Sequence, residues 1–292
     1  MSITATMVKE LRERTGSGMM ECKKALVETS GNLDAAIELM RKSGLAKADK
    51  KSNRIAAEGR IGVKVSTDSK TAVIVDVNCE TDFVAKADDF VAFVDDLTES
   101  LLTTAIKNDE QLMGMVLSSN ETVDEARRRL VAKLGENITV RRFEKFSASG
   151  QVGCYLHGNR IGVIVELSGS DPELAKDVAM HIAASKPLCV SEDQVPEEMI
   201  AKEKEIFMAQ AAESGKPAAI IEKMIAGKIK KYLSEITLLG QPFIKDDKVN
   251  VGKLVSGKST EVLRFSRFEV GEGVEKKEEN FAEEVMAQVR GN

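Results

Sequence analysis

The sharpest chemical pattern in the sequence is GKLVSGKS at residues 252–259. Two glycines followed by Lys and Ser match the phosphate-binding loop of nucleotide hydrolases. That loop works only after a buried strand and at the start of a helix, where backbone amides and the helix dipole converge on phosphate. Here residues 245–248 before the pattern are charged, and residues 260–270 after it read as a strand. The sequence therefore disfavours a nucleotide site at this position.

A second candidate is the segment NCETDFVA at residues 78–85, where a predicted strand gives way to a helix. Function concentrates at such strand ends and loops. Two interpretations stay open. In the structural one, Thr81 or Asp82 caps the helix, and Phe83 shares the core-facing stripe of Phe90. In the functional one, Asp82 and Phe83 protrude together as an acid and an aromatic wedge aimed at the cleft of a partner protein.

The histidines and the paired methionines complete the set of reactive or adaptable side chains. His157 heads a predicted turn beside Tyr155, and no Ser, Cys or carboxylate stands at a spacing that would make a catalytic set with it. It reads as an exposed turn histidine. His181 lies within a predicted helix and is expected to face the core. Met19 and Met20 either fill a core or form an adaptable contact surface.

The four cysteines give no sign of a metal site. Cys22, Cys79, Cys154 and Cys189 lack Cys-x-x-Cys spacing, and only two histidines are available to assist them. We expect four reduced, mostly buried thiols, and no metal or cofactor. With no Trp and two Tyr, the chain also has little equipment for stacking on bases or sugars.

Charge and composition favour a protein partner. The 42 Lys and Arg residues against 47 Asp and Glu give a net charge of −5, which is poor for neutralising phosphates of nucleic acid. Hydrophobic residues make up 42% and charged residues 30% of the 292, a balance that permits folding. At roughly 150 residues per domain this length predicts about two domains. We find no run long enough to span a bilayer and no signal peptide, so we expect a cytoplasmic protein.

The elements that must position these residues begin with a small bundle. Gly16, Gly31 and Gly44 each follow an apolar helical pattern, as C-terminal stops do, and predict three short helices. The basic residues between Gly44 and residue 55 predict a solvated linker. The charged run 127–129 is likewise expected on a solvated face.

Two α+β units follow the bundle. Alternating apolar residues predict a hairpin over 61–77, then helices from Phe90 and Thr122 and a strand at 138–146. The same order recurs from residue 151, with a closing strand near 263–268, so we infer a duplicated unit. Each unit is expected to lay its helices on one face of a small, mainly antiparallel sheet.

The second unit carries an insertion. Residues 196–233 read as two helices, and Ile221, Ile225 and Ile229 keep near-heptad spacing on the second of them. This pattern predicts a short antiparallel coiled coil. Such an arm either contacts another molecule or packs on its own subdomain.

Five motifs along the whole chain resemble those of the bacterial elongation factor Ts family. They are VKELR at 8–12, TGSGMM at 15–20, NCETDFVA at 78–85, HIAASKP at 181–187 and RFEVGEG at 267–273. The resemblance implies a guanine-nucleotide exchange factor that is no enzyme in the covalent sense. Its partner would be elongation factor Tu, the GTPase that carries aminoacyl-tRNA to the ribosome. It would bind the GDP form, displace Mg²⁺ and GDP, and allow GTP to rebind.

The resemblance also implies roles for particular residues. In the family the N-terminal bundle is ubiquitin-associated-like and contacts the GTPase domain, which here would use Arg12, Met19 and Met20. His157 resembles a further contact. The residues that match the magnesium-displacing element are Thr81, Asp82, Phe83 and Val84. The inserted hairpin resembles a dimerisation module, and residues 280–289 resemble a C-terminal helix that also touches the GTPase.

The expected fold class is α+β: a three-helix bundle and two repeated subdomains, the second interrupted by a helical hairpin. The expected segments are the bundle and linker 1–55, the core N-subdomain 56–147, the core C-subdomain 148–190 and 236–270, the dimerisation hairpin 191–235, and the C-terminal module 271–292. We expect no direct contact with nucleic acid or membrane. The rival classes are a helical adaptor that leaves its partner's ligand unaltered and, third, a nucleotide-binding enzyme.

Overall fold

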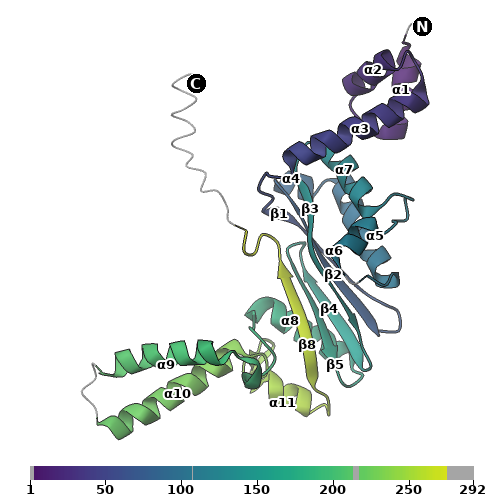
Figure 1. Ribbon diagram of the computed structural model, residues 1–292. Helices are drawn as coiled ribbons and strands as arrows, with labels where there is room; N and C mark the ends of the chain where they lie inside the picture. The colour runs from purple at the N-terminus through teal and green to yellow at the C-terminus, as the bar shows by residue number, and fades with distance from the viewer. Residues whose placement is uncertain (1–2, 107, 213–216, 275–292) are drawn as a thin grey trace.

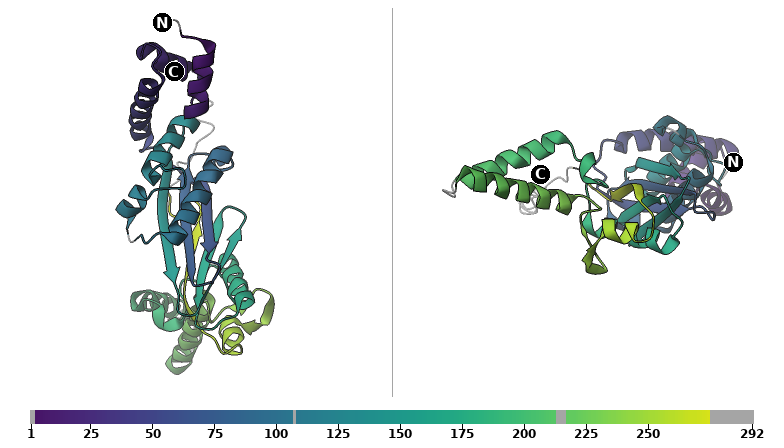
Figure 2. Two further views of the ribbon diagram at one scale, coloured as in Figure 1. Left: turned by 90° about the vertical axis from the view of Figure 1, so that its right-hand side faces the viewer. Right: turned by 90° about the horizontal axis from the view of Figure 1, so that it is seen from below.

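The computed structural model describes residues 3–106, 108–212 and 217–274. A helical bundle lies at one end of an elongated molecule, two small sheets with their helices form the middle, and a two-helix arm projects at the other end (Figure 1). Figure 2 shows the same separation of bundle and arm from two further directions. The expected α+β class is confirmed. No helix in these described ranges is long and apolar enough to cross a membrane.

The bundle consists of α1 (Ala5–Thr15), α2 (Met19–Glu28) and α3 (Leu33–Lys51). The Thr4 hydroxyl caps α1 by accepting a hydrogen bond from the Met7 amide, and Gly16 ends the helix in the left-handed region at φ 65°. Leu11, Cys22 and Leu26 are buried between the helices. The three predicted helices are therefore present.

The third helix is longer than the sequence predicts. We expected Gly44 to end it, but α3 continues to Lys51 and packs along α7 (Val123–Leu134). A Cβ atom on Gly44 would stand 3.4 Å from the Cβ of Ala132, which places Gly44 on the face of α3 that contacts α7. The Lys51 ammonium donates to the Gly135 carbonyl at 2.5 Å. The expected solvated linker is thus largely helix, because packing on α7 outweighs the low helix propensity of glycine.

The first sheet has the order β1-β2-β3, all antiparallel, with β1 at Glu58–Val65, β2 at Thr71–Cys79 and β3 at Ile138–Ser147. Helices α5 (Asp88–Thr103), α6 (Asp109–Gly114) and α7 pack beside it. A capping box between Thr122 and Glu125 begins α7, and Gly135 ends it at φ 82°. The hairpin, the helices from Phe90 and Thr122, and the closing strand are confirmed.

The second sheet repeats this plan in the order β4-β5-β8. Its strands are β4 (Gln151–His157), β5 (Ile161–Leu167) and β8 (Val262–Glu269), and α8 (Pro172–Ser185) packs on it. Both sheets carry an irregularity near the end of the central strand, after Asp76 in the first and after Glu166 in the second. The predicted duplication is confirmed down to this detail.

The two sheets pack against each other through their inner faces. Val73, Val75 and Val77 of β2 face the helices of the first unit, and the alternate residues of that strand face the second sheet. Ile74 there joins a core with Ile164 of β5. This explains why nearly every residue of β2 is buried.

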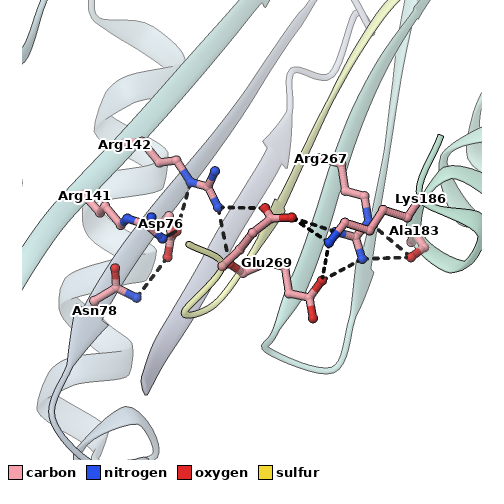
Figure 3. Close-up of polar contacts among 9 residues, drawn as sticks. Asp76, Asn78, Arg141, Arg142, Ala183, Lys186, Arg267 and Glu269 are labelled. Atoms are coloured by element: carbon pink, nitrogen blue, oxygen red, sulfur yellow. Dashed lines mark hydrogen bonds and ion pairs between the residues drawn. The ribbon is translucent and has the colours of Figure 1, made fainter. Parts of the chain in front are cut away.

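Charged groups join the two halves at one edge of this sandwich (Figure 3). The Asp76 carboxylate is fully buried and accepts from Nε of Arg142 at 3.1 Å. Arg142 also donates to the Glu269 carbonyl at 3.3 Å. Arg267 bonds the Glu269 carboxylate at 2.9 Å and the Ala183 carbonyl at 3.3 Å. The network therefore ties the first sheet to the second and to the end of α8.

The projecting arm consists of α9 (Glu197–Ala212) and α10 (Ala218–Ile236), preceded by the short 3₁₀ turn η1 (Glu192–Gln194). The predicted helical hairpin is confirmed. Ile225 is buried in α10, whereas Ile206, Met208 and Ile220 are exposed. The arm buries only part of its apolar surface within one chain.

The region after the arm contains β6 (Pro242–Phe243), β7 (Asp246–Asn250) and α11 (Val251–Ser256). The phosphate-loop pattern starts inside α11, after a short, largely exposed strand, and ends in the turn at Ser259, before β8 begins at Val262. The loop and the following helix that phosphate binding requires are replaced by a helix and a following strand. The strand β7 itself was not predicted, but the conclusion against a nucleotide site is unchanged.

One charged run also differs from expectation. Arg127 on α7 is only 15% exposed, since it pairs with Asp124 at 2.7 Å and donates to the Ile138 carbonyl at 3.2 Å. Arg127 therefore joins α7 to β3, and the run 127–129 is only partly a solvated face. The C-terminal helix expected at 280–289 lies outside the described residues.

Candidate functional site

The segment after β2 forms a short helix, α4 (Asp82–Ala85), that presents one large apolar side chain to solvent. The Phe83 ring is 81% exposed, whereas Val84 and Ala85 of the same turn are buried in the first core. Because α4 ends before α5 starts at Asp88, Phe83 does not continue the stripe of Phe90. The interpretation that placed Phe83 in the core is therefore wrong.

Hydrogen bonds fix the entry to α4 from the neighbouring strand. One Glu136 oxygen accepts from the amides of Glu80 at 3.1 Å and Thr81 at 3.0 Å, and the other accepts from the Thr81 hydroxyl at 2.6 Å. In return the Glu80 carboxylate accepts from the Asn137 amide at 2.6 Å. The backbone that leads to Phe83 is held at successive residues.

Asp82 is the acidic neighbour of the exposed ring. Lys86, one turn on, pairs with its carboxylate at 2.6 Å. The hydrogen bond from Lys86 lowers the pKa of Asp82, and burial opposes this shift. The group is therefore ionised at neutral pH, and α4 carries a lysine-paired carboxylate next to an exposed aromatic ring.

His157 lies at the same end of the sheets as α4. It ends β4 and is exposed, with the Tyr155 hydroxyl 3.2 Å from its Nδ1 atom. The Asn159 carbonyl of this turn accepts from the Ile61 amide at 2.9 Å. Glu58, three residues earlier on β1, is paired with Cys79 in the sheet, and three residues of strand cover about 10 Å. The turn and α4 thus share one edge of the molecule.

The bundle places its candidate residues near this end too (Figure 1). Met19 and Met20 open α2 and are 61% and 74% exposed, and Arg12 is exposed on α1. The alternative that these methionines fill the bundle core is therefore wrong. The expected contacts therefore come from the bundle, from α4 and from the turn between β4 and β5.

The thiols and the second histidine are unsuited to covalent chemistry. Cys79 lies beside the site, and burial raises the pKa of its thiol to about 12, so the reactive thiolate is absent at neutral pH. His181 is fully buried, as predicted, and is bonded to Gln241 at 3.0 Å. All four cysteines are free. Within the described residues no cluster of three His, Cys, Asp or Glu side chains could hold a metal ion.

Sequence reasoning missed Glu136, Asn137 and Lys86. Glu136 meets Thr81 only because the pairing of Cys79 with Ile138 brings the two turns side by side. A local pattern carries no trace of that pairing. Lys86 could have been found, since a basic residue four positions after Asp82 on a helix predicts an ion pair.

Comparisons with known proteins agree with the resemblance. The model of the family described as Elongation factor TS matches residues 80–272. The chain is 66% identical over 293 residues to "Elongation factor Ts" of Methylococcus capsulatus, covering 100% of both chains. It is 62% identical over 293 residues to the protein of that name from Thioalkalivibrio sulfidiphilus, again covering 100% of both. With "Elongation factor Ts" of Halorhodospira halophila it shares 57% identity over 290 residues, 99% of each chain.

Proposed function

The chain belongs to the elongation factor Ts family, and on that premise we propose that it is a translation elongation factor that exchanges the guanine nucleotide of elongation factor Tu. It displaces Mg²⁺ and GDP from the GTPase and allows GTP to rebind, without forming a covalent bond. The observation that carries the proposal is Phe83, a large ring 81% exposed on a short helix whose entry is fixed by hydrogen bonds.

The α4 segment acts as a wedge beside the nucleotide site of the GTPase. Mg²⁺ bridges phosphate oxygens to the protein, so its displacement removes a large share of the nucleotide's affinity. Phe83 supplies the bulk that intrudes, and Asp82 supplies negative charge close to phosphate and metal. Thr81 and Val84 hold the segment by capping the helix and anchoring it in the core.

Linkage gives the energetic condition for exchange. A factor that binds the emptied GTPase better than the GDP form must weaken GDP binding by the same ratio. Each tenfold weakening requires about 1.4 kcal/mol of differential contact free energy. The contacts that matter are therefore those made only when the nucleotide has left.

The other candidate residues enlarge the contact with the GTPase. Met19 and Met20 form an exposed, adaptable apolar pair, and Arg12 adds a charge on the neighbouring helix. His157 adds a contact from the turn between β4 and β5. We assign these residues to affinity, and Asp82 and Phe83 to the release step.

The division of the chain follows the same proposal. The bundle (1–55) and the core N-subdomain (56–147) face the GTPase. The C-subdomain (148–190 and 236–270) supports His157, and the module 271–292 adds a last contact. The arm (191–235) mediates self-association of the chain. The protein acts in the cytoplasm, with no direct contact to nucleic acid or membrane.

The test is release of a fluorescent GDP analogue from elongation factor Tu with and without this chain. We expect the chain to accelerate release, and Asp82→Ala/Phe83→Ala to lose most of the acceleration while still binding the GTPase. Glu173→Ala, which removes an exposed carboxylate at the start of α8, is the matched control and should release GDP normally.

Three other results would contradict the proposal or its residue assignment. Binding to the GTPase without accelerated release would identify an adaptor. Direct binding of GDP to this chain would favour a nucleotide-binding protein. Unaltered exchange by the double variant would remove Asp82 and Phe83 from the release step.

A further inference from the structure

We propose that Glu136 is the positioning residue of the α4 wedge, acting on nucleotide release only through the orientation of Phe83. This inference rests on the proposed exchange function. Glu136 lies in the turn between α7 and β3 and is assigned no contact with the GTPase. Its carboxylate is the common acceptor for two backbone amides and one hydroxyl of the wedge segment.

The hydrogen bond between the Thr81 hydroxyl and Glu136 determines where the hydroxyl proton points. The hydroxyl has one proton, which it donates to Glu136 at 2.6 Å. Its lone pairs are then free to accept the Val84 amide at 3.4 Å, which is the cap of α4. Glu136 therefore fixes the direction of the hydrogen bond that starts the helix carrying Phe83.

The second subdomain provides an internal comparison. The register shift after Asp76 corresponds to the one after Glu166, so Thr81 corresponds to Asp171 and Glu136 to Lys258. Thr81 and Asp171 are the N-caps of α4 and α8, and the Lys258 ammonium lies 3.7 Å from the Asp171 carboxylate where Glu136 accepts from the Thr81 hydroxyl.

Other residues hold the strand-to-helix connection of the second subdomain. The Thr260 hydroxyl accepts from the Gly169 amide at 2.7 Å, and the Ser168 hydroxyl accepts from the Glu261 amide at 2.9 Å. Neither of these bonds involves the N-cap Asp171, whereas Glu136 accepts from the N-cap Thr81 itself.

Two features are present only in the first subdomain. There the N-cap is a hydroxyl that a carboxylate holds, and the helix carries an exposed aromatic ring. In the second subdomain the N-cap is the Asp171 carboxylate, which accepts from the Leu174 amide and has Lys258 opposite it. The carboxylate of Glu136 therefore accompanies the wedge and is not repeated with the fold.

Preorganisation explains why this matters for release. A wedge held in its working orientation need not be ordered at the moment it enters the GTPase. Loss of the orienting bond should leave the affinity contributed by the bundle intact and reduce the rate at which bound complexes lose GDP. A displacement of the wedge by about 1 Å is enough to change the rate strongly.

The decisive variant is Glu136→Thr, whose shorter side chain removes the carboxylate from the Thr81 hydroxyl; far-UV circular dichroism checks that it folds. In stopped-flow release of the fluorescent GDP analogue, we expect the maximal rate at saturating factor to fall about tenfold. The half-saturating concentration should change by less than about twofold. Glu136→Gln can still accept from the two amides, but its side-chain NH₂ group faces the Thr81 hydroxyl. We expect its maximal release rate to fall about threefold.

A double-mutant cycle with Phe83→Ala separates positioning from general stability. If Glu136 acts through Phe83, Glu136→Thr should not reduce the maximal release rate further in the Phe83→Ala background. Equal losses in both backgrounds, or a wild-type maximal rate in either folded Glu136 variant, would overturn the inference. Phe83→Ala with normal exchange would instead remove the proposed function on which it rests.

Discussion

The guanidinium of Arg142 lies over the ring of Phe268, with its carbon 4.3 Å from the ring centroid. The reciprocal pair is Arg264 over Phe146, at 4.2 Å. Phe146 follows Arg142 on β3 at the same spacing at which Phe268 follows Arg264 on β8. Each arginine therefore stacks on the phenylalanine of the other sheet. The two halves are joined as two copies of one unit would be in a symmetric dimer.

Each of these arginines is also bonded to a buried acid on the central strand of its own sheet. Asp76 binds Arg142 at 3.1 Å, and Glu166 binds Arg264 at 2.7 Å. Burial raises the pKa of Asp76 although Arg142 and Arg141 stand beside it. The acids hold the arginines in position for stacking across the interface.

Asp76→Asn should therefore destabilise the fold by about 2 kcal/mol, because two arginines lose the charge they share. The free energy of unfolding in urea measures this. Asp95→Asn, at an exposed position on α5, should stay within about 0.5 kcal/mol of the wild type. Equal effects of the two substitutions would show that the buried pair contributes nothing particular.

His181 should make stability depend on pH. The Ile244 amide donates to Nδ1, so Nε2 carries the proton that bonds Gln241. Burial lowers the pKa of His181 below its usual 6.5, against the opposing hydrogen bond of Gln241. Between the pKa of His181 in the folded protein and its higher pKa in the unfolded chain, the unfolded chain binds more protons. The free energy of unfolding therefore decreases as the pH falls from about 6.5 through the pKa of the folded state.

The check compares unfolding free energies between about pH 7 and pH 5 for the wild type and His181→Gln. The variant starts from lower stability but should show a shallower decline on acidification. A decline of the same slope in both proteins would assign the pH dependence to other groups.

Gly162 and Gly227 should respond in opposite directions to alanine. A Cβ on Gly162 would collide with Ile61 and stand 2.7 Å from a methyl of Val63, where the two sheets meet, so Gly162→Ala should cost about 1–3 kcal/mol. Nothing lies within 4 Å of the corresponding position on Gly227 in α10. Gly227→Ala should stabilise by about 0.5–1 kcal/mol. Thermal unfolding distinguishes the two signs.

The arm should govern the mass of the protein in solution. Met208 and Ile220 are 52% and 47% exposed on α9 and α10 and suit a second copy of the arm. Light scattering should give a dimer for the native chain and a monomer for Met208→Glu/Ile220→Glu or for the chain without the arm. An unchanged mass in these variants would contradict self-association through this surface.

The strands of the two main sheets and most helices could be predicted because their signals are local, and the repeat follows from the shared order of these elements. Alternation over 61–77 and the glycine after Leu134 report the elements that contain them. Gly44 misled because α3 packs along α7, which lies far along the chain and leaves no local signal. Phe83 stayed ambiguous because a break between two short helices, invisible in an apolar pattern, decides whether its ring faces the core.

Only those residues of the candidate site that have a local signal could be predicted. Its exposed residues are marked by type, as Met19, Met20 and the Asp82–Phe83 pair show. The supporting group, Glu136, depends on strand register, which no single motif reports. The network around Asp76 likewise arises from three strands, β2, β3 and β8, that only the tertiary fold brings together.

The central claim is that this protein binds the emptied GTPase more tightly than the GDP-loaded one. Titrating the chain against elongation factor Tu, once stripped of nucleotide and once saturated with GDP and Mg²⁺, tests it directly. We predict at least about a hundredfold tighter binding to the stripped form, equivalent to about 2.8 kcal/mol, and a smaller ratio for Phe83→Ala. Equal dissociation constants for the two forms would contradict the account.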